Sequence, residues 1–199
     1  MLTARAWDEG FYDEWVVAVP GAELAQDESL RRDTTPERLA RLKPAFVADG
    51  TVTAGNSSPL NDGAGAALIG DESVPGEPLA RIVSRGVHAV DPDVFGIAPV
   101  EAANQALARA GIGWEEIEVV ELNEAFAAQS LACVRSWPEL DPDRVNVNGG
   151  AIAIGHPLGA SGVRILVGLA RELRRRGGGY GLATLCIGVG QGLAVVLEA

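Results

Sequence analysis

The chain has 199 residues, a hydrophobic content of 47% and a formal net charge of -11. This length and apolar content suffice for a buried core and indicate a globular protein of one domain or of a domain with an extension. The negative charge would repel a phosphate backbone and no basic cluster offsets it, so we expect no nucleic acid partner. No stretch approaches about 20 consecutive apolar residues, so we expect no membrane span and no membrane partner.

Two cysteines, Cys133 and Cys186, give neither a disulfide framework nor a paired metal-ligand spacing. Such cysteine usage is typical of a reducing compartment. The first residues, Met1 to Gly10, carry acidic groups and no apolar segment of the kind found in signal peptides. We therefore expect a cytoplasmic protein without a metal site.

The first part of the chain, residues 1–60, is polar and irregular, which predicts a loop-rich subdomain. A short helix is expected to end near Gly10, and Glu14–Val19 has the pattern of a strand. Thr34-Thr35-Pro36-Glu37 predicts a helix start, because a hydroxyl can cap the first turn and proline fits the first helical position. That helix is expected to run through Leu42.

From Asn61 the composition shifts to Ala, Gly, Val and Ile, which defines a second part, residues 61–199. Apolar runs typical of strands alternate there with segments whose apolar residues recur at three- and four-residue intervals, as helices require. The expected strands are Ala64–Ile69, Ala80–Val87, Val119–Leu122, Gly181–Leu185 and Leu193–Leu197. The expected helices are Val100–Ala110, Glu124–Arg135 and Gly159–Arg176. This alternation predicts an α/β fold in which helices cover apolar central strands.

A first motif runs from a predicted strand directly into a predicted helix, and Asn123 stands at the junction. Asparagine is among the best helix-capping residues, so its role could be structural. Alternatively, an amide held at a helix N-terminus can bind a water or an oxyanion. Glu124 would then lie where the helix dipole favours a carboxylate. The sequence alone leaves both interpretations open.

A second motif places His156 in a glycine-dense stretch, with five glycines within residues 149–162. The glycines permit left-handed turns and close backbone approach, and Pro157 blocks a helix before the next helical segment. A lone histidine is usually structural. Because this one is presented at a constrained turn, we favour a functional role for it, whereas His88 lies in a strand-like segment without such a setting.

A third motif places Cys186 where an apolar strand breaks into alternating glycines, Gly188, Gly190 and Gly192. Such backbone can present amide N–H groups to an oxyanion. We expect the Cys186 thiol to be accessible to a ligand, whereas Cys133, inside a predicted helix, is well explained as a small buried hydrophobic residue. A nucleotide-binding loop is disfavoured because the GK[ST] ending and the following helix are missing.

Together these motifs, in this order, resemble the thiolases, the acyl-CoA C-acyltransferases, over essentially the whole chain. The resemblance rests on Asn123-Glu124-Ala125-Phe126, Asn148-Gly149-Gly150, Gly155-His156-Pro157, Cys186 with Gly188 and Gly190, and an earlier segment, residues 50–58, that continues into Leu60-Asn61-Asp62-Gly63. It implies a thiolase-like fold, namely the C-terminal half of the layered αβαβα architecture (residues 61–199) plus the end of the loop domain (residues 1–60).

The resemblance implies catalytic roles for four residues. In thiolases one cysteine is acylated and a second moves the proton of the acetyl methyl group; Cys186 matches the second. His156 matches the residue that activates the nucleophilic cysteine and donates to the thioester oxygen. Asn123 matches the residue that holds a water in the same oxyanion hole, and the Gly188 amide would line the hole for the acyl-enzyme. Losing one such donor typically costs about 3 kcal/mol of transition-state stabilisation.

The same resemblance implies coenzyme A and acetyl-CoA as substrates, with no tightly bound cofactor. Ala54 and Ser58 would contact the pantetheine arm and Phe46 would line the adenine end. Ala125-Phe126 would flank the tunnel that holds the arm. Arg31, or its neighbour Arg32, is a candidate partner of the nucleotide phosphates.

A complete thiolase contains two similar α/β halves, and the resemblance does not extend to the first half with its nucleophilic cysteine. Cys133 lacks the glycine-lined setting needed to replace that nucleophile. We therefore expect a complementary N-terminal half as a partner, a homo-oligomer once complete, and no turnover by the chain alone. Apolar surface left uncovered should promote association of the isolated chain, with rescue by co-expression.

The choice of substrate and of function class stays open to alternatives. Glu121-Leu122 before Asn123, with Gly190-Gln191-Gly192, favours a degradative thiolase acting on 3-oxoadipyl-CoA over a biosynthetic acetoacetyl-CoA thiolase. A non-catalytic acyl-CoA-binding or assembly module is an alternative from another class. A decarboxylating condensing enzyme would use two histidines, and Cys186 at the second position argues against it.

Overall fold

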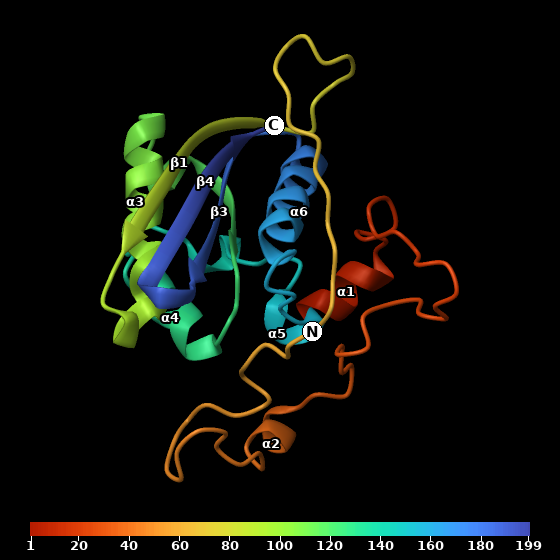
Figure 1. The fold of residues 1–199 in the computed structure, drawn as a ribbon, viewed down its shortest axis with the longest axis vertical. Coiled ribbons are helices and arrows are strands. Elements are labelled where there is room, and N and C mark those ends of the chain that lie inside the picture. The colour runs from red at the N-terminus through yellow and green to blue at the C-terminus, as the bar shows by residue number, and fades with distance from the viewer.

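The computed structural model describes residues 1–199, and its centre is a sheet covered by helices on both faces (Figure 1). The α-helices are α1 (Leu2–Asp8), α2 (Pro36–Leu39), α3 (Ala98–Ala110), α4 (Ala127–Arg135), α5 (Ala151–Ile154) and α6 (Ser161–Arg176). The strands are β1 (Arg81–Ala89), β2 (Ile117–Leu122), β3 (Tyr180–Ile187) and β4 (Gln191–Glu198). Short 3-10 helices lie at Pro92–Ile97, Trp114–Glu116, Pro142–Arg144 and Gly188–Gly190. None of the helices has both the length and the apolar character required to cross a membrane.

The sheet is mixed, with the strand order β1-β4-β3-β2. β2 and β3 are parallel, whereas β4 is antiparallel to both of its neighbours. Leu122 at the end of β2 pairs with Thr184 near the end of β3. Because parallel strands end at the same edge of a sheet, the segments that follow β2 and β3 leave the sheet side by side. This edge carries two of the three sequence motifs.

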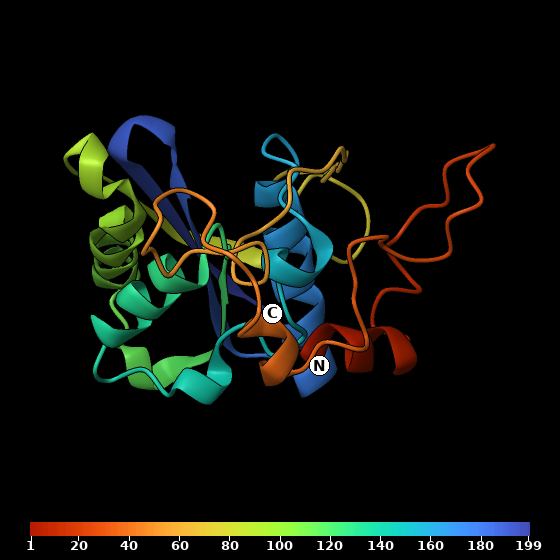
Figure 2. The same cartoon turned by 90° about the horizontal axis from the view of Figure 1, so that it is seen from below.

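Two helical layers enclose the sheet, as the view from below shows (Figure 2). α6 packs on one face through Ile165, Leu169 and Leu173, which recur at four-residue intervals and contact Val119 and Ala183 of the strands. It ends at Gly177, whose φ of 96° gives the left-handed C-terminal cap that glycine adopts without strain. One side of the sheet behind the motifs is therefore sealed by a rigid helix.

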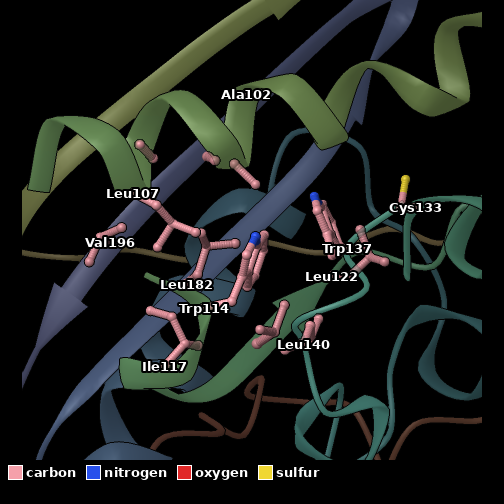
Figure 3. Packing of buried hydrophobic residues seen from close by; sticks show 14 residues of the cluster. Ala102, Leu107, Trp114, Ile117, Leu122, Cys133, Trp137, Leu140, Leu182 and Val196 are labelled. Atoms are coloured by element: carbon pink, nitrogen blue, oxygen red, sulfur yellow. The ribbon is translucent and has the colours of Figure 1, made fainter. Parts of the chain in front are cut away.

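α3 and α4 cover the opposite face, over the larger of two hydrophobic clusters (Figure 3). α3 presents a face of small buried residues, Ala102, Ala103 and Ala106, which lets its backbone approach β1 and β4 closely. Trp114 and Trp137 fill the space below it, with ring centroids 4.8 Å apart. Large aromatic side chains thus compensate for the small residues of the helix.

The α/β prediction is confirmed. Four of the five strands expected in residues 61–199 are present with shifted ends. The three helices expected there and the helix expected after Thr35 are present as well, also with shifted ends. Thr35 caps α2 as expected, with its side chain accepting from the Arg38 amide, but the helix ends at Leu39 rather than Leu42. The strand predicted at Glu14–Val19 is wrong. The segment begins in a turn, in which the amides of Trp15 and Val16 donate to the Tyr12 carbonyl, and no strand pairs with the residues that follow.

The strand predicted at Ala64–Ile69 is also wrong. This exposed segment belongs to an irregular stretch that runs along α6 without entering the sheet (Figure 1, yellow). The stretch lies close to α6 at Gly65, where only the missing Cβ avoids contact with Val163. Further along the stretch, Arg174 of α6 donates to the carbonyl oxygen of Leu79 at 2.9 Å. Apolar content alone predicted a strand, but a strand needs a ladder partner, and these residues have none among residues 1–199.

The closeness of α3 to β1 predicts an intolerance at Gly86. A Cβ there would overlap the carbonyl oxygen of Ala102, although the Gly86 backbone needs no left-handed φ. Gly86→Ala should therefore lower the free energy of unfolding by about 2–3 kcal/mol through overpacking. Gly159→Ala is the matched control, because Gly159 is exposed, lies outside the helices, and an added Cβ there would meet nothing within 4 Å apart from its chain neighbours. It should change stability by less than about 0.5 kcal/mol. Equal urea midpoints for the two variants would contradict the close approach.

Candidate functional site

Asn123 directly follows β2 and extends its ladder by one bond, since its amide donates to the Thr184 carbonyl at 3.0 Å. The helix that was expected to begin at residue 124 begins at Ala127, and Phe126 is its N-terminal flanking residue. The capping interpretation of Asn123 is therefore wrong. Its side chain is 2% exposed, and Nδ2 lies 3.2 Å from Nε2 of His156.

Glu124 does not lie at the N-terminus of α4, contrary to the expectation, but its carboxylate reaches the N-terminus of α5. Its carboxylate accepts hydrogen bonds from the Asn146 side chain at 3.1 Å and from the Ile152 amide at 3.1 Å. Asn146 in turn bonds both backbone groups of Leu122, through Leu122 N and Leu122 O at 2.8 Å each. Glu124 thus ties the segment after β2 to the start of α5, and this link fixes the two motifs relative to each other.

His156 is positioned by backbone and side-chain contacts together. The preceding Gly155 has a φ of 86°, and the His156 amide donates to the Pro59 carbonyl at 2.9 Å. The left-handed turn needs glycine, and a Cβ at Gly155 would also collide with the Asn61 side chain. The predicted constrained turn is present, and it orients the imidazole ring toward Asn123.

A second contact determines the tautomer of His156. Nδ1 lies 2.6 Å from Oγ of Ser161, and that hydroxyl donates to the Pro157 carbonyl at 3.0 Å. A serine hydroxyl has one proton to donate, so toward the ring it can only accept. Nδ1 therefore carries the proton, and Nε2 is the acceptor for the Asn123 amide. Ser161 is a positioning residue that the sequence patterns did not reveal, because only the folded turn brings it beneath the ring.

The charge state of His156 follows from its surroundings. Burial lowers the pKa of the imidazole below its ordinary value of 6.5, and the positive charge of Arg164 lowers it further. The ring is therefore neutral at physiological pH, with an unprotonated Nε2. A neutral imidazole held in one tautomer by a hydrogen bond to the other nitrogen is the form that acts as a general base.

Cys186 lies near the end of β3, opposite Gly192 of β4. The expectation of an open thiol is wrong for this structure, since Cys186 is 7% exposed. Burial raises the pKa of the thiol above 9.0, outweighing the effect of a backbone hydrogen bond, so the group stays protonated at neutral pH. Cys186 stands beyond Thr184, the partner of Asn123, and thus belongs to the same edge of the sheet.

The backbone after Cys186 is strained. Gly188 is exposed, and Val189, a β-branched residue, has a φ of 68° and is 81% exposed. Left-handed backbone is unfavourable for such a residue, and strain of this kind concentrates at functional sites. The following Gly190 has a φ of 92°, and a Cβ there would overlap the Val90 carbonyl oxygen. The turn is therefore held in one shape, with Gly188 at its outer side.

An opening of about 360 Å³ lies beside His156. It is lined by Leu60, Asn61, Asp62, His156 and Leu158. This volume falls in the range of small-molecule sites, which extends from about 300 to 1,000 Å³. The predicted functional histidine is therefore reachable from the surface, although the surrounding wall is built by residues on two distant segments.

Four of the six residues expected to contact coenzyme A lie together. The Ser58 amide and hydroxyl both donate to the Ala125 carbonyl, at 3.1 and 3.0 Å, and the ring centroids of Phe46 and Phe126 lie 6.1 Å apart. These bonds bring the segment after α2 to the start of α4 (Figure 2, orange).

The other two, Ala54 and Arg31, lie on the exposed surface. The neighbouring Arg32 is engaged in an ion pair with Asp8 at 3.0 Å, whereas Arg31 forms no ion pair. Of the two arginines considered, Arg31 is thus the one whose charge is free, but no hydrogen bond joins it to Ser58 or Phe46.

Cys133 is placed as expected of a structural residue. It is fully buried in the larger cluster, and its Sγ donates to the Gly96 carbonyl at 3.3 Å. Burial raises the pKa of its thiol to about 11. A thiol with this pKa and no exposure is a poor nucleophile, so Cys133 does not supply one.

These contacts predict how His156 titrates. In the 199-residue chain its imidazole should titrate below pH 6.5, and nitrogen-detected NMR should show the Nδ1–H tautomer at neutral pH. Ser161→Ala removes the acceptor for that proton, so the tautomer ratio should move toward Nε2–H by about fivefold. Ser136→Ala is the matched control, because its hydroxyl bonds only the Ala132 carbonyl on an exposed helix end. A midpoint at or above 6.5, or an unchanged ratio in Ser161→Ala, would refute this assignment.

Comparison with known proteins shows the family to which the chain belongs. Residues 76–199 match the family described as "Thiolase, C-terminal domain", and residues 2–73 match "Thiolase, N-terminal domain". An acetyl-CoA acetyltransferase of Rhizobium meliloti is 53% identical over 179 residues, covering 87% of this chain and 45% of the relative. The 3-oxoadipyl-CoA/3-oxo-5,6-dehydrosuberyl-CoA thiolase of Escherichia coli is 46% identical over 209 residues, covering 98% and 52%.

A solved structure of human mitochondrial 3-ketoacyl-CoA thiolase in complex with CoA superimposes with a TM-score of 0.87 at 41% identity, covering 100% of this chain and 51% of that one. The chain thus spans about half the length of the relatives it matches. The match to the C-terminal domain covers more than half of the residues, and the thiolase-like fold expected from the motifs is confirmed. The chain belongs to the thiolase family.

Proposed function

We propose that residues 1–199 supply the proton-transfer and oxyanion groups of an acyl-CoA C-acyltransferase that cleaves a 3-oxoacyl-CoA with free coenzyme A. The observation that carries the proposal is the neutral His156, whose unprotonated Nε2 is held by Asn123 beside a surface opening. Cys133 is enclosed in the hydrophobic core and Cys186 would serve as the proton carrier, so the acylated cysteine would come from a segment outside these residues.

In the first step His156 Nε2 would take the proton of that cysteine. The resulting thiolate attacks the 3-oxo carbon of the substrate, and the bond between carbons 2 and 3 breaks. The acyl group then remains on the cysteine, and the electron pair of the broken bond forms the enolate of acetyl-CoA. The imidazolium N–H and a water held by Asn123 would stabilise the enolate oxygen, as preorganised donors do in acyl transfer.

Cys186 would complete the cycle in two proton transfers. Its thiol first donates a proton to the enolate carbon, which gives acetyl-CoA. The thiolate left behind takes the proton of incoming coenzyme A, whose sulfur attacks the acyl-enzyme while the amide of Gly188 binds the developing oxyanion. The departing cysteine recovers its proton from His156, so all groups return to their starting states. The raised pKa of Cys186 suits this direction, because cleavage begins with a protonated thiol.

The residues around Ser58 and Phe126 would hold the pantetheine arm. Support comes from their clustering near the opening and from the related human structure, which contains CoA. We propose the same role for Ala54, with Phe46 toward the adenine and Arg31 toward the phosphates. Residues 1–60 would then form the coenzyme-binding part and residues 61–199 the catalytic part.

A partner, an oligomeric state and a cellular location follow from this proposal and stay predictions. The family resemblance supports a complementary N-terminal half that carries the acylated cysteine, and a homo-oligomer once that half is present. The cysteine usage of the sequence supports a cytoplasmic location.

The proposal predicts that Cys186→Ala abolishes turnover of 3-oxoacyl-CoA by the chain combined with the N-terminal half of a related thiolase. Without the thiol, no group delivers the proton to the enolate carbon, and general acid–base catalysis contributes typically 10²–10⁴-fold, so a loss of about a hundredfold to ten-thousandfold is expected. Cys133→Ala should retain activity within about twofold, because Cys133 packs in the core. If the combined protein shows no turnover even when Cys133 and Cys186 are both present, the result would instead favour a non-catalytic acyl-CoA-binding module.

Substrate choice gives a separate prediction. Relatives include both an acetyl-CoA acetyltransferase and a 3-oxoadipyl-CoA thiolase, so the comparisons leave acyl-chain preference open. We propose 3-oxoadipyl-CoA, on the strength of Glu121-Leu122 and Gly190-Gln191-Gly192. 3-Oxoadipyl-CoA carries one methylene and one terminal carboxylate more than acetoacetyl-CoA. Burial of the methylene contributes about 0.8 kcal/mol and a hydrogen bond to the carboxylate about 1.5–3 kcal/mol, so kcat/KM should exceed that for acetoacetyl-CoA by at least about fourfold. A preference for acetoacetyl-CoA would reassign the protein to the biosynthetic type.

A further inference from the structure

A small cavity lies behind Asn123, on the face of the sheet that α6 covers. Its volume is about 30 Å³, which is enough for roughly one or two water molecules. Tyr12, Glu121, Asn123 and Arg164 are among the polar residues that line it. Glu121 and Asn123 reach it from the same side because they stand two positions apart on an extended segment.

Two polar groups of this cavity have no partner in the protein. Oδ1 of Asn123 is buried without a hydrogen bond, while Nδ2 of the same amide contacts His156. Glu121 is 8% exposed, and no hydrogen bond supports its charged form. Burial, followed by repulsion from Glu124, raises the pKa of Glu121 to about 8, although Arg164 opposes the shift. At neutral pH Glu121 is thus a buried acid with a proton to donate.

We propose that Glu121 is a positioning residue that orients the Asn123 amide across this cavity and thereby determines which nitrogen of His156 carries the proton. As a neutral acid, Glu121 donates toward Oδ1, directly or through a water, and Nδ2 then faces Nε2 of His156. As a carboxylate it can only accept. The amide then turns, Nδ2 faces Glu121, and Oδ1 faces His156.

The turned amide has a consequence for the ring. Oδ1 accepts from an Nε2–H group, so the proton must leave Nδ1, and Ser161 then donates its hydroxyl proton to Nδ1 instead of to Pro157. In this second arrangement Nε2 has no lone pair to receive the proton of a nucleophile. The inference rests on the proposed function for its catalytic meaning, but the hydrogen-bond rearrangement itself needs no substrate.

Several charged groups surround the two titrating residues, and they come from different elements. The groups that face Glu121 are Arg164 and Glu172 of α6, Glu124 after β2, and Tyr12. Asp27 in turn faces Arg164. The groups that face His156 are Arg164 and Asp62. Burial raises the pKa of Tyr12 far above neutrality, and hydrogen bonds from Arg175, Arg176 and Asn148 overcome burial to lower the pKa of Glu172. Glu121 is therefore the member of this group expected to change charge near pH 8.

The test follows the His156 tautomer by nitrogen-detected NMR in the intact 199-residue chain. The titration runs from about pH 6.5 to about pH 9.5, which brackets the Glu121 pKa of about 8. In the wild-type chain the ratio of Nδ1–H to Nε2–H should fall by about fivefold across this range, the effect of one exchanged hydrogen bond. In Glu121→Gln, whose amide can both donate and accept at any pH, the ratio should stay constant.

Glu118→Gln is the matched control, because Glu118 stands on the same strand but is exposed, and it should titrate like the wild-type chain. A flat wild-type ratio, or a Glu121→Gln variant that still changes with pH, would overturn the inference. The wild-type titration decides the matter even if Glu121→Gln fails to fold. Since no substrate or second half is used, this outcome is independent of whether the assembled protein proves to be an acyltransferase.

Discussion

The hydroxyl of Ser161 has a single proton, and the carbonyl of Pro157 accepts it. While this bond is formed, the ring nitrogen that contacts Ser161 donates to the hydroxyl, so the other nitrogen of His156 is the acceptor. Asn123 then presents its amide N–H to that acceptor. A chain of short contacts from a turn carbonyl to the end of a strand thus determines whether the histidine can act as a base.

The rest of the fold keeps this chain in place. Parallel pairing of β2 with β3 puts Asn123 and Cys186 at one edge of the sheet, while the left-handed turn at Gly155 delivers His156 to the same edge. Glu124 ties these two loops together through Asn146 and Ile152. The groups come from three separate segments, so the geometry of the candidate site depends on the packing of α6 and on the closely approached α3 rather than on any single motif.

Electrostatics gives the two proposed proton carriers different protonation preferences. Burial acts in opposite directions on them, because it disfavours the charged form of each: the pKa of His156 falls and the pKa of Cys186 rises. At neutral pH the histidine is therefore a base and the cysteine an acid. Two groups in one site whose environments separate their pKa values in this way indicate their acid and base assignments.

The sequence patterns predicted the parts of the molecule that local rules govern. Apolar runs such as Val119–Leu122 became strands, and Thr35 with Pro36 began a helix. Local rules failed where the outcome depends on distant partners. Ala64–Ile69 has strand composition but no ladder partner. Asn123 was a candidate cap by residue type, but the helix begins only at Ala127.

The site was recognised in sequence by its motifs, but the residues that orient it were not. Ser161 and Glu121 carry no pattern that distinguishes them from an ordinary helix residue and an ordinary strand residue. Their importance arises from one short contact and one cavity, which exist only after the chain has folded. The expected accessibility of the Cys186 thiol was also wrong. The glycines beside Cys186 predict backbone freedom, but they do not predict which residues cover the thiol.

In the proposed site His156 binds the oxygen of a thioester, and Cys186 exchanges a proton with the methyl carbon of the same thioester. A crystal structure of the chain assembled with a cysteine-bearing N-terminal half and soaked with acetyl-CoA would test it most directly. In the acetylated protein His156 holds the proton of that cysteine, so its Nε2–H should donate to the thioester oxygen of a second acetyl-CoA, with the methyl carbon in contact with Cys186 Sγ and the pantetheine arm passing Ser58. An acetyl group bound away from the Asn123–His156 pair, with Cys186 still enclosed by protein, would contradict it.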